Sequence, residues 1–257
     1  LVLALVVLPV ATFLVARSQA RDSLIEESLA TAKSHVETIE EWGRSRARIV
    51  ASAVKVFEEP ESAKTLAVLR DAGSFSTVYI GYADKKYVLS EEQNLPPDYD
   101  PTSRQWYQQA AAAGTSVITP PYISASDGKV VVTFATPVGA GTSAKGVAAG
   151  DVSMESVVAT VASIKPTPQS FGFMASSDGK IIAHPDAGLA LKPLSDLSKD
   201  LSSERLAAAG KSRELLAVEI NGRQRLLTVV PIGGTSWMLV VALDEREALA
   251  PILDGLG

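Results

Sequence analysis

Apolar residues recur at helical spacing from Ser18 to Phe57 and form one long stripe. Glu, Arg and Lys stand between the members of the stripe, and no proline interrupts it before Pro60. At 1.5 Å per residue, such a segment would make a rod of about 60 Å. The pattern predicts a single long helix. It is typical both of a core helix in a domain and of a stalk helix that pairs with a copy of itself, and the two interpretations are compatible.

The stretch before this helix, "LVLALVVLPVATFLVA", contains no charge over residues 1–16. Sixteen residues are slightly fewer than the roughly 20 that span a bilayer. We interpret residues 1–17 as a transmembrane helix that is truncated at its start, continuous with the long helix over 18–58. A signal-peptide core is the alternative, but the run passes into the charged helix without a clear cleavage site.

Beyond Pro60 the apolar positions alternate in short runs, which is typical of β-strands. Residues 75–90 contain two such runs joined through "ADKK", a hairpin signature. Residues 129–152 contain two more around a loop rich in Gly and Ser, and a helix is expected to begin near Ser153. The pattern predicts a first antiparallel α+β unit over 59–164.

A proline-rich linker, "IKPTPQS", separates this unit from a second one. The segment "FGFMASSDGKIIAHP" repeats the hairpin pattern with Asp178-Gly179 at its turn, and Asn221-Gly222 forms another turn further on. The second unit is expected over 165–246, followed by an exit segment, 247–257. The predicted fold class is therefore α+β, a long N-terminal helix followed by two antiparallel-sheet modules.

Composition excludes several classes of protein. The net charge of −5 gives no electrostatic support to nucleic-acid binding. With no cysteine and only two histidines, His35 and His184, disulfide, thiolate and histidine-rich metal chemistry are not expected. No Gly-x-Ser-x-Gly elbow is present, and "GAGTSAKG" has the wrong spacing for a nucleotide fingerprint. We therefore expect no enzyme activity, no metal and no cofactor.

The segment "YDPTSRQWYQQAAAAG" concentrates unusual chemistry. Asp100 and Pro101 are typical of a helix start, and Gly114 is typical of its end. The front half of the segment also carries a planar cation, an indole N–H and two phenol hydroxyls, from Arg104, Trp106, Tyr99 and Tyr107.

These side chains suit a free α-amino acid, whose carboxylate and ammonium group lie close together. Arg104 offers a planar fork for the carboxylate, and the Trp106 N–H and the Tyr99 hydroxyl supply further donors. Asp151 would face the ammonium group with help from the Tyr122 hydroxyl or a nearby backbone carbonyl. On a regular helix Arg104 and Trp106 would point to nearly opposite sides, so both reach one ligand only if the chain is not yet helical at Arg104.

Each residue also has a purely structural interpretation. The aromatic residues could be core residues or close a loop, the arginine could form a surface ion pair, and the aspartate could cap the following helix: Trp106, Tyr107, Tyr122, Arg104 and Asp151. The joint spacing of these residues favours a ligand site.

The order of "VYIGYADKKYVLS", "YDPTSRQWYQQA", "PPYISASDGKVVVTFATPV", "GVAAGDVSMESV" and "FGFMASSDGKIIAHP" resembles the double Cache family. Members are extracytoplasmic sensor domains of bacterial chemoreceptors and sensor kinases, built from two PAS-like modules. The resemblance implies that 18–58 is a stalk, 59–164 a membrane-distal, ligand-binding module and 165–246 a membrane-proximal module. It also implies that 247–257 leads to a second transmembrane helix.

One subgroup of this family binds amino acids through a spaced set of residues. This sequence is similar to that pattern at six positions: Tyr99, Arg104, Trp106, Tyr107, Tyr122 and Asp151. At a seventh position, two residues past Tyr122, many members place an acid, whereas Ser124 stands here and Asp127 follows in an "SDG" turn. The resemblance implies that these seven positions line the ligand pocket.

The expected function is that of a periplasmic sensor domain of a methyl-accepting chemoreceptor in the inner membrane. Such a domain would bind a small amino acid, or a related amine or carboxylate, and would dimerise with a second copy in the full receptor. Alternatives are the same sensor on a histidine kinase or diguanylate cyclase, an amine or organic-acid sensor, and an exported enzyme.

Overall fold

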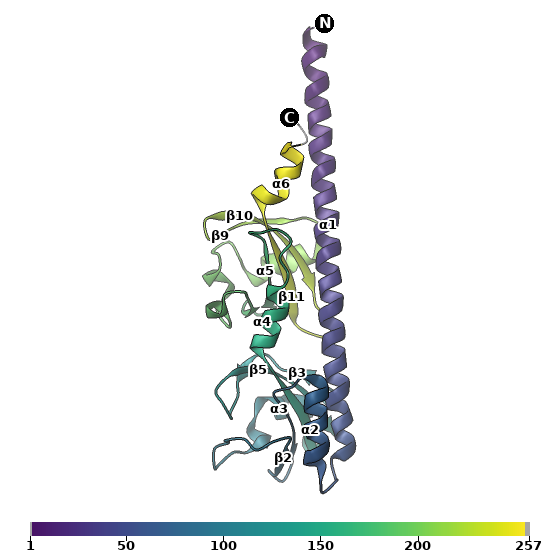
Figure 1. Ribbon diagram of the computed structural model, residues 1–257, viewed down its shortest axis with the longest axis vertical. Helices are drawn as coiled ribbons and strands as arrows, with labels where there is room; N and C mark the ends of the chain where they lie inside the picture. The colour runs from purple at the N-terminus through teal and green to yellow at the C-terminus, as the bar shows by residue number, and fades with distance from the viewer. Residues whose placement is uncertain (1, 255–257) are drawn as a thin grey trace. The chain divides into compact units, whose positions relative to one another are not determined.

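The computed structural model describes the chain from residue 2 to residue 254, with side chains from residue 10 to residue 251 (Figure 1). Helix α1, Val2–Ala53, is one continuous helix of 52 residues, and a 3₁₀ turn, η1 (Val54–Val56), follows it. The predicted long helix is therefore confirmed, and it ends close to the expected position.

Among the residues that the structure describes, none of the helices combines the length and the apolar character that crossing a membrane requires. Much of the predicted transmembrane segment, 1–17, falls on residue 1 and on side chains 2–9, which lie outside the described residues. The predicted exit over 247–257 corresponds in part to helix α6, Glu245–Asp254, and residues 255–257 again lie outside the described residues.

The chain divides into two compact units, each with one antiparallel sheet. One unit is Ile39–Val157, called the first module below. The other comprises Leu1–Thr38 and Val158–Gly257, called the second module. The division falls inside helix α4, Met154–Ala162. No strand pairing in the described part joins the two sheets. The predicted boundary between residues 164 and 165 stays a prediction.

The first module is built on a six-stranded sheet, called sheet A. Its strands follow the order β2-β1-β6-β5-β3, and β4 also pairs with β5. The predicted hairpins are confirmed, since β1 pairs with β2 and β5 with β6. The bounds are Thr77–Tyr82 for β1, Tyr87–Leu89 for β2, Val117–Ile118 for β3, Tyr122–Ile123 for β4, Val130–Val138 for β5 and Gly146–Ser153 for β6.

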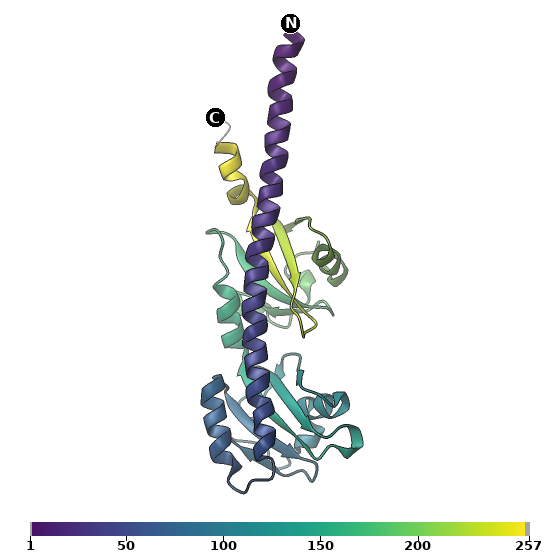
Figure 2. The same cartoon turned by 90° about the vertical axis from the view of Figure 1, so that its right-hand side faces the viewer.

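Alternation along the strands of sheet A directs side chains to two different neighbours. On one face Phe134 meets the rings of Trp42 in α1 and Phe75 at centroid distances of 5.8 and 6.2 Å. Helix α2, Ser62–Gly73, runs alongside the last turns of α1 in both views (Figures 1 and 2). The opposite face is covered by helix α3, Gln105–Ala113, whose apolar side packs on Ala135, Val147 and Ala149.

The sequence predicts one helix starting at Asp100, and this boundary is wrong. The Asp100 carboxylate accepts the Thr102 N–H at 2.9 Å and caps a short 3₁₀ turn, η2 (Pro101–Ser103). The backbone is extended at Arg104, with φ −83° and ψ 148°, before α3 begins. The predicted stop is confirmed, because Gly114 adopts the left-handed φ of 65° that favours glycine.

The second module contains a five-stranded sheet, called sheet B, in the order β8-β7-β11-β10-β9. Its core gathers fully buried residues such as Phe173, Leu206 and Val240. The predicted turn at Asn221-Gly222 is confirmed, since both residues have positive φ. The bounds are Phe171–Ser176 for β7, Ile181–Ala183 for β8, Leu216–Ile220 for β9, Arg223–Pro231 for β10, Trp237–Asp244 for β11, Ala187–Leu189 for η4, Leu194–Asp196 for η5 and Ser203–Lys211 for α5.

One corner of the second module ties the segment before β7 to the start of α6. The Gln169 N–H donates to the Glu247 carboxylate at 3.0 Å, and the Asp244 N–H donates to the Ser170 hydroxyl at 2.9 Å. The buried Arg225 guanidinium also donates to the Gln169 carbonyl oxygen. We call this set of contacts the corner network.

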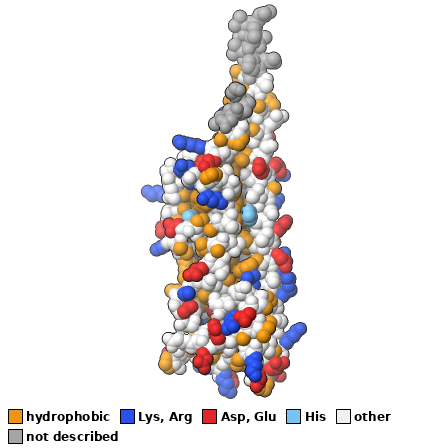
Figure 3. All heavy atoms as spheres, in the orientation of Figure 1, with side chains coloured by type: hydrophobic (Ala, Val, Ile, Leu, Met, Phe, Trp, Pro, Cys, Tyr) orange, Lys and Arg blue, Asp and Glu red, His pale blue; other side chains and the backbone are white. Residues whose placement is uncertain are grey.

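Charged side chains of both signs are interspersed over the face drawn in Figure 3. Together with the net charge of −5, this mixed distribution gives the drawn face no basic stripe of the kind that follows a nucleic-acid backbone.

Candidate ligand-binding site

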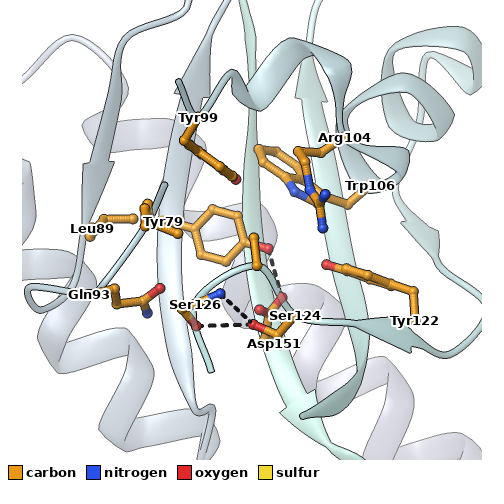
Figure 4. Close-up of a pocket in the computed structure, with 12 residues that line it drawn as sticks. Tyr79, Leu89, Gln93, Tyr99, Arg104, Trp106, Tyr122, Ser124, Ser126 and Asp151 are labelled. Atoms are coloured by element: carbon orange, nitrogen blue, oxygen red, sulfur yellow. Dashed lines mark hydrogen bonds between the residues drawn. The ribbon is translucent and has the colours of Figure 1, made fainter. Parts of the chain in front are cut away.

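A pocket opens on the α3 side of sheet A and encloses about 310 Å³, its open mouth included. Figure 4 shows its walls, which come from strands β1, β2, β4 and β6, from α3 and the residue before it, and from the loops after β2 and β4. The lining residues are Tyr79, Leu89, Gln93, Leu95, Tyr99, Arg104, Trp106, Tyr122, Ser124, Ala125, Ser126 and Asp151.

Arg104 supplies the pocket with a cation that no described acidic side chain neutralises. Its guanidinium lies 5.9 Å from the centre of the Tyr122 ring, and Nη2 donates a long hydrogen bond of 3.4 Å to the Ile123 carbonyl oxygen. Within the described part of the chain, no acidic side chain forms an ion pair with it. This arrangement argues against the ordinary surface ion pair and leaves the fork available for a carboxylate.

The break between η2 and α3 allows Arg104 and Trp106 to reach the same pocket. Because Arg104 is extended and precedes the helix, the opposed orientation expected on a regular helix does not apply. Trp106, 1% exposed, meets the Tyr79 ring edge-on at 4.9 Å. Gly81 on β1 permits this close approach, since a Cβ there would come within 2.8 Å of the Trp106 ring.

Asp151 supplies the opposite charge from the floor of the pocket. The carboxylate is 6% exposed, and its Oδ1 accepts hydrogen bonds from the Tyr79 and Thr133 hydroxyls, both at 2.7 Å. Both of these hydrogen bonds go to Oδ1, and Oδ2 accepts none from the described residues. Burial raises the pKa of Asp151 to about 6, although these two hydroxyls oppose the rise. A cationic group in the pocket would therefore relieve an unfavourable buried charge.

The direction of the hydrogen bonds follows from the chemistry of these groups. An ionised carboxylate only accepts, so Thr133 must use its single proton on Asp151. The 2.6 Å contact between the Tyr122 and Thr133 hydroxyls then requires Tyr122 to donate. The Tyr122 oxygen consequently turns only acceptor lone pairs toward the pocket. On this side the site accepts hydrogen bonds, whereas on the Arg104 side it donates them.

The tyrosines of the pocket remain neutral near physiological pH. Burial raises the pKa of Tyr99 to about 12, and it raises the pKa of Tyr122 and that of the fully enclosed Tyr79 well above the ordinary value. All three therefore act as hydroxyl groups in any binding event. Among the described residues, no group of three or more acidic, cysteine or histidine side chains is arranged to hold a metal ion.

The pocket collects six of the seven residues that the sequence predicts: Tyr99, Arg104, Trp106, Tyr122, Ser124 and Asp151. Tyr107 is absent from the lining and instead packs against the Trp106 ring at 5.7 Å. Sequence reasoning missed Tyr79, Gln93 and Ser126 in the lining, and also Thr133 beneath it. Tyr79 and Thr133 sit on predicted strands, but only the strand register reveals that they meet Asp151.

The long helix, the two antiparallel sheets and the pocket on the first sheet define a double sensor module of the PAS-like kind. Residues 16–252 match the family model dCache_1, described as a Cache domain, and the chain belongs to this family. The predicted resemblance and fold class are confirmed.

Curated relatives are bacterial chemoreceptors. The methyl-accepting chemotaxis protein PctB of Pseudomonas aeruginosa is 29% identical over 241 residues, covering 91% of this chain and 37% of PctB. PscA of Pseudomonas syringae is 27% identical, covering 93% of this chain and 38% of PscA. The chain thus spans little more than a third of these relatives.

Solved structures with the same fold are ligand-binding domains of chemoreceptors. The domain of Pseudomonas fluorescens CtaA in complex with L-isoleucine has a TM-score of 0.78 at 26% identity, covering 91% of this chain and 98% of that chain. The PctB domain of Pseudomonas aeruginosa in complex with L-Arg has a TM-score of 0.75 at 27% identity, covering 90% and 99%. The comparisons confirm the predicted family of Cache domains, and the similar solved structures are chemoreceptor ligand-binding domains in complex with amino acids.

Proposed function

We propose that this chain is the sensor part of a methyl-accepting chemoreceptor and that the first module binds a free L-α-amino acid. The observation that carries the proposal is the pairing of two unsatisfied charges in one pocket, the Arg104 guanidinium and the Oδ2 atom of Asp151. A zwitterion offers one complement to each of them. The amino-acid complexes of related domains support this choice of ligand.

In the proposed pose, the ligand carboxylate lies on the Arg104 side, where the indole N–H of Trp106 and the Tyr99 hydroxyl supply further donors. The ammonium group lies on the Asp151 side, where the Tyr122 oxygen adds a second acceptor. Because both charges leave water together, each must be matched for binding to be favourable. The site would therefore discriminate strongly against molecules that lack either group.

The test begins with a thermal-shift screen of the isolated chain against the twenty common L-amino acids. A ligand present at 100 times its Kd adds about 2.7 kcal/mol of stability. Calorimetry then compares the best-binding amino acid with its carboxamide and with its deaminated acid. Both analogues are expected to bind at least about 30-fold more weakly, since each leaves one buried charge unpaired.

The outcomes separate the candidate functions. If the amide binds as well as the parent while the deaminated acid does not bind, the site is an amine sensor and the carboxylate assignment is wrong. The reverse result would indicate an organic-acid sensor. If no amino acid stabilises the chain, the proposed function fails altogether.

The proposal extends to the receptor around this chain. The first module would be membrane-distal, the second module membrane-proximal, and α1 a stalk that continues from a transmembrane helix and pairs with a second copy in the inner membrane. The relatives, which are methyl-accepting chemotaxis proteins, support this arrangement. In a full receptor, crosslinking of single cysteines along residues 18–57 should change when amino acid is added. An unchanged pattern at every position would contradict a signal carried by this helix.

A further inference from the structure

A second cleft adjoins the ligand pocket on the far side of Asp151. It encloses about 560 Å³, open mouth included, and shares four lining residues with the pocket: Gln93, Ser124, Ser126 and Asp151. Both hollows lie in the first module. Because Asp151 lines both, a ligand whose ammonium group contacts this carboxylate would lie next to the cleft.

The charges around the cleft are unbalanced. Its lining contains three carboxylates, from Glu91, Asp127 and Asp151, and no lysine, arginine or histidine. Arg70 neutralises Glu91 through a contact of 2.8 Å. Asp127 accepts the backbone N–H of Lys129 at 3.0 Å and forms no ion pair with any described side chain.

Apart from Glu91, which Arg70 neutralises, a bound zwitterion would neutralise all but one of the charges that line the pocket and the cleft, and the remaining charge is negative. Its carboxylate offsets Arg104 and its ammonium group offsets Asp151, which leaves Asp127 without a complement. The Asp127 charge also acts on the buried carboxylate, since it contributes to raising the pKa of Asp151. The two acids therefore favour the same sign of ligand charge.

We propose that this cleft receives the side chain of the bound amino acid and that Asp127 makes the site prefer a side chain that ends in a cation. The inference rests on the proposed function and adds the ligand class to it. A neutral polar side chain, hydrogen-bonded to Gln93 or Ser126, is the competing occupant.

Two amino acids of matched length test the preference. L-lysine and L-norleucine share an unbranched four-carbon side chain, and only L-lysine carries the terminal ammonium. Calorimetry at low ionic strength is expected to give about fivefold tighter binding of L-lysine, the upper end for a charge pair with an exposed carboxylate such as Asp127. The ratio should approach one at about 1 M salt, where screening removes the interaction.

The variants Asp127→Asn and Asp84→Asn form a matched pair. Asp84 also accepts the N–H of the residue two positions on, at 3.1 Å in the β1–β2 turn, but it lines neither hollow. In Asp127→Asn the preference for L-lysine over L-norleucine should disappear, whatever common change the substitution makes to both affinities through Asp151. In Asp84→Asn both affinities should remain those of the unsubstituted chain.

The results distinguish failure of the inference about Asp127 from failure of the proposed amino-acid binding. Equal binding of the two ligands by the unsubstituted chain, tighter binding of L-norleucine, or an unchanged ratio in Asp127→Asn overturns the inference and leaves the proposed function standing. The inference alone also fails if neither ligand binds while another amino acid of the screen does. Binding of no amino acid at all overturns both.

Discussion

Each of the two sheets places an aspartate at or near the end of its third strand, and the surroundings of the two aspartates differ. Asp151 near the end of β6 and Asp244 at the end of β11 both lie on the third strand of their sheets. The residue opposite Asp151 on the neighbouring strand is Thr133, whereas the residue opposite Asp244 is Arg225. One carboxylate thus has a neutral cross-strand partner and the other a cationic one.

This difference decides whether the carboxylate is available to a ligand. Arg223 and Arg225 contact Asp244 at 2.6 and 3.9 Å, and the Glu247 N–H donates to its other oxygen at 3.1 Å. Burial alone would raise the pKa of Asp244, but these groups outweigh burial and hold that pKa below its ordinary value. A threonine donates a hydrogen bond without adding charge, so Asp151 keeps its need for a cation. A buried acid indicates a ligand site only when the chain leaves it unneutralised.

The largest effect on ligand affinity is expected from Asp151→Asn, compared with the separate variant Asp244→Asn. Asp151→Asn removes the buried counter-charge of the ligand ammonium, so calorimetry should show a loss of about 100-fold or more in affinity for the best-binding amino acid. Asp244→Asn should leave affinity unchanged and should lower the free energy of unfolding by about 1.5–3 kcal/mol, the range for hydrogen bonds to charged groups. A loss of binding in Asp244→Asn with folding intact would contradict the comparison.

Removal of the cation at the pocket is expected to have a somewhat smaller effect. Arg104 is partly exposed. Arg104→Ala leaves the ligand carboxylate without its main partner and should lower the affinity by about 30-fold. Arg104→Lys keeps the charge but loses the planar fork, so its affinity should lie between the two. Isothermal titration with the same amino acid checks the order, and equal affinity in all three proteins would exclude a carboxylate role.

Acid pH should affect binding and stability in opposite directions. Because the pKa of Asp151 in the free protein is about 6, affinity for an amino acid should fall below pH 6 by up to tenfold per pH unit. The same raised pKa means that the folded state binds the proton more tightly than the unfolded state. The ligand-free chain should therefore gain stability from Asp151 as the pH falls from 6 toward 4.

The Asp151→Asn variant isolates this contribution. The difference in melting temperature between the unsubstituted chain and Asp151→Asn should shrink between pH 7 and pH 4.5, since the neutral amide resembles the protonated acid. Asp244 behaves oppositely, because its pKa is lowered, and its contribution is lost as the pH falls through that lowered value. A difference in melting temperature that does not vary with pH would show that burial does not raise the pKa of Asp151.

Substitution of Thr133, the cross-strand partner of Asp151, should weaken amino-acid binding by about fivefold. Thr133→Val removes one hydrogen bond to Asp151 and frees the Tyr122 proton to point into the pocket. The loss of this hydrogen bond should reduce the binding free energy by about 1 kcal/mol. With one donor fewer, the pH midpoint for binding should move above 6. Thr133→Ser should restore both affinity and midpoint, whereas a purely structural role would leave the midpoint unmoved.

The smallest effect is expected at Tyr107, which sequence reasoning assigns to the ligand. Since the side chain packs on Trp106 outside the pocket lining, Tyr107→Phe should change amino-acid affinity by less than about twofold. Tyr122→Phe serves as its counterpart within the pocket and should weaken binding more. A loss at Tyr107 that equals the loss at Tyr122 would restore its predicted contact with ligand.

The sequence predicts the strands well because their signals are local. Alternation and turn residues such as Asn221-Gly222 identify the hairpins without knowledge of the rest of the chain. Helices α2 and α5, of 12 and 9 residues, are not anticipated by the pattern of strand-like runs. The start of α3 is misplaced because Asp100 and Pro101 favour a 3₁₀ turn as readily as an α-helix.

The site is predictable where residues cluster in the sequence and unpredictable where strands bring them together. Arg104 and Trp106 belong to one short segment, so their chemistry can be inferred directly. Tyr79 and Thr133 reach Asp151 only through pairing of β1 and β5 with β6, and strand register is not encoded by any one segment. That Asp151 lies opposite a threonine and Asp244 opposite an arginine can therefore be seen only in the folded molecule.

The corner network has a mechanical consequence for the second module. Gln169 and Ser170 belong to the segment that leads into β7, and Asp244 and Glu247 belong to the segment that leads out along α6. Arg225 bonds to the first segment and faces the second across 3.9 Å. Because these polar contacts join the two segments, a displacement of the segment before β7 should either carry the start of α6 with it or break the contacts.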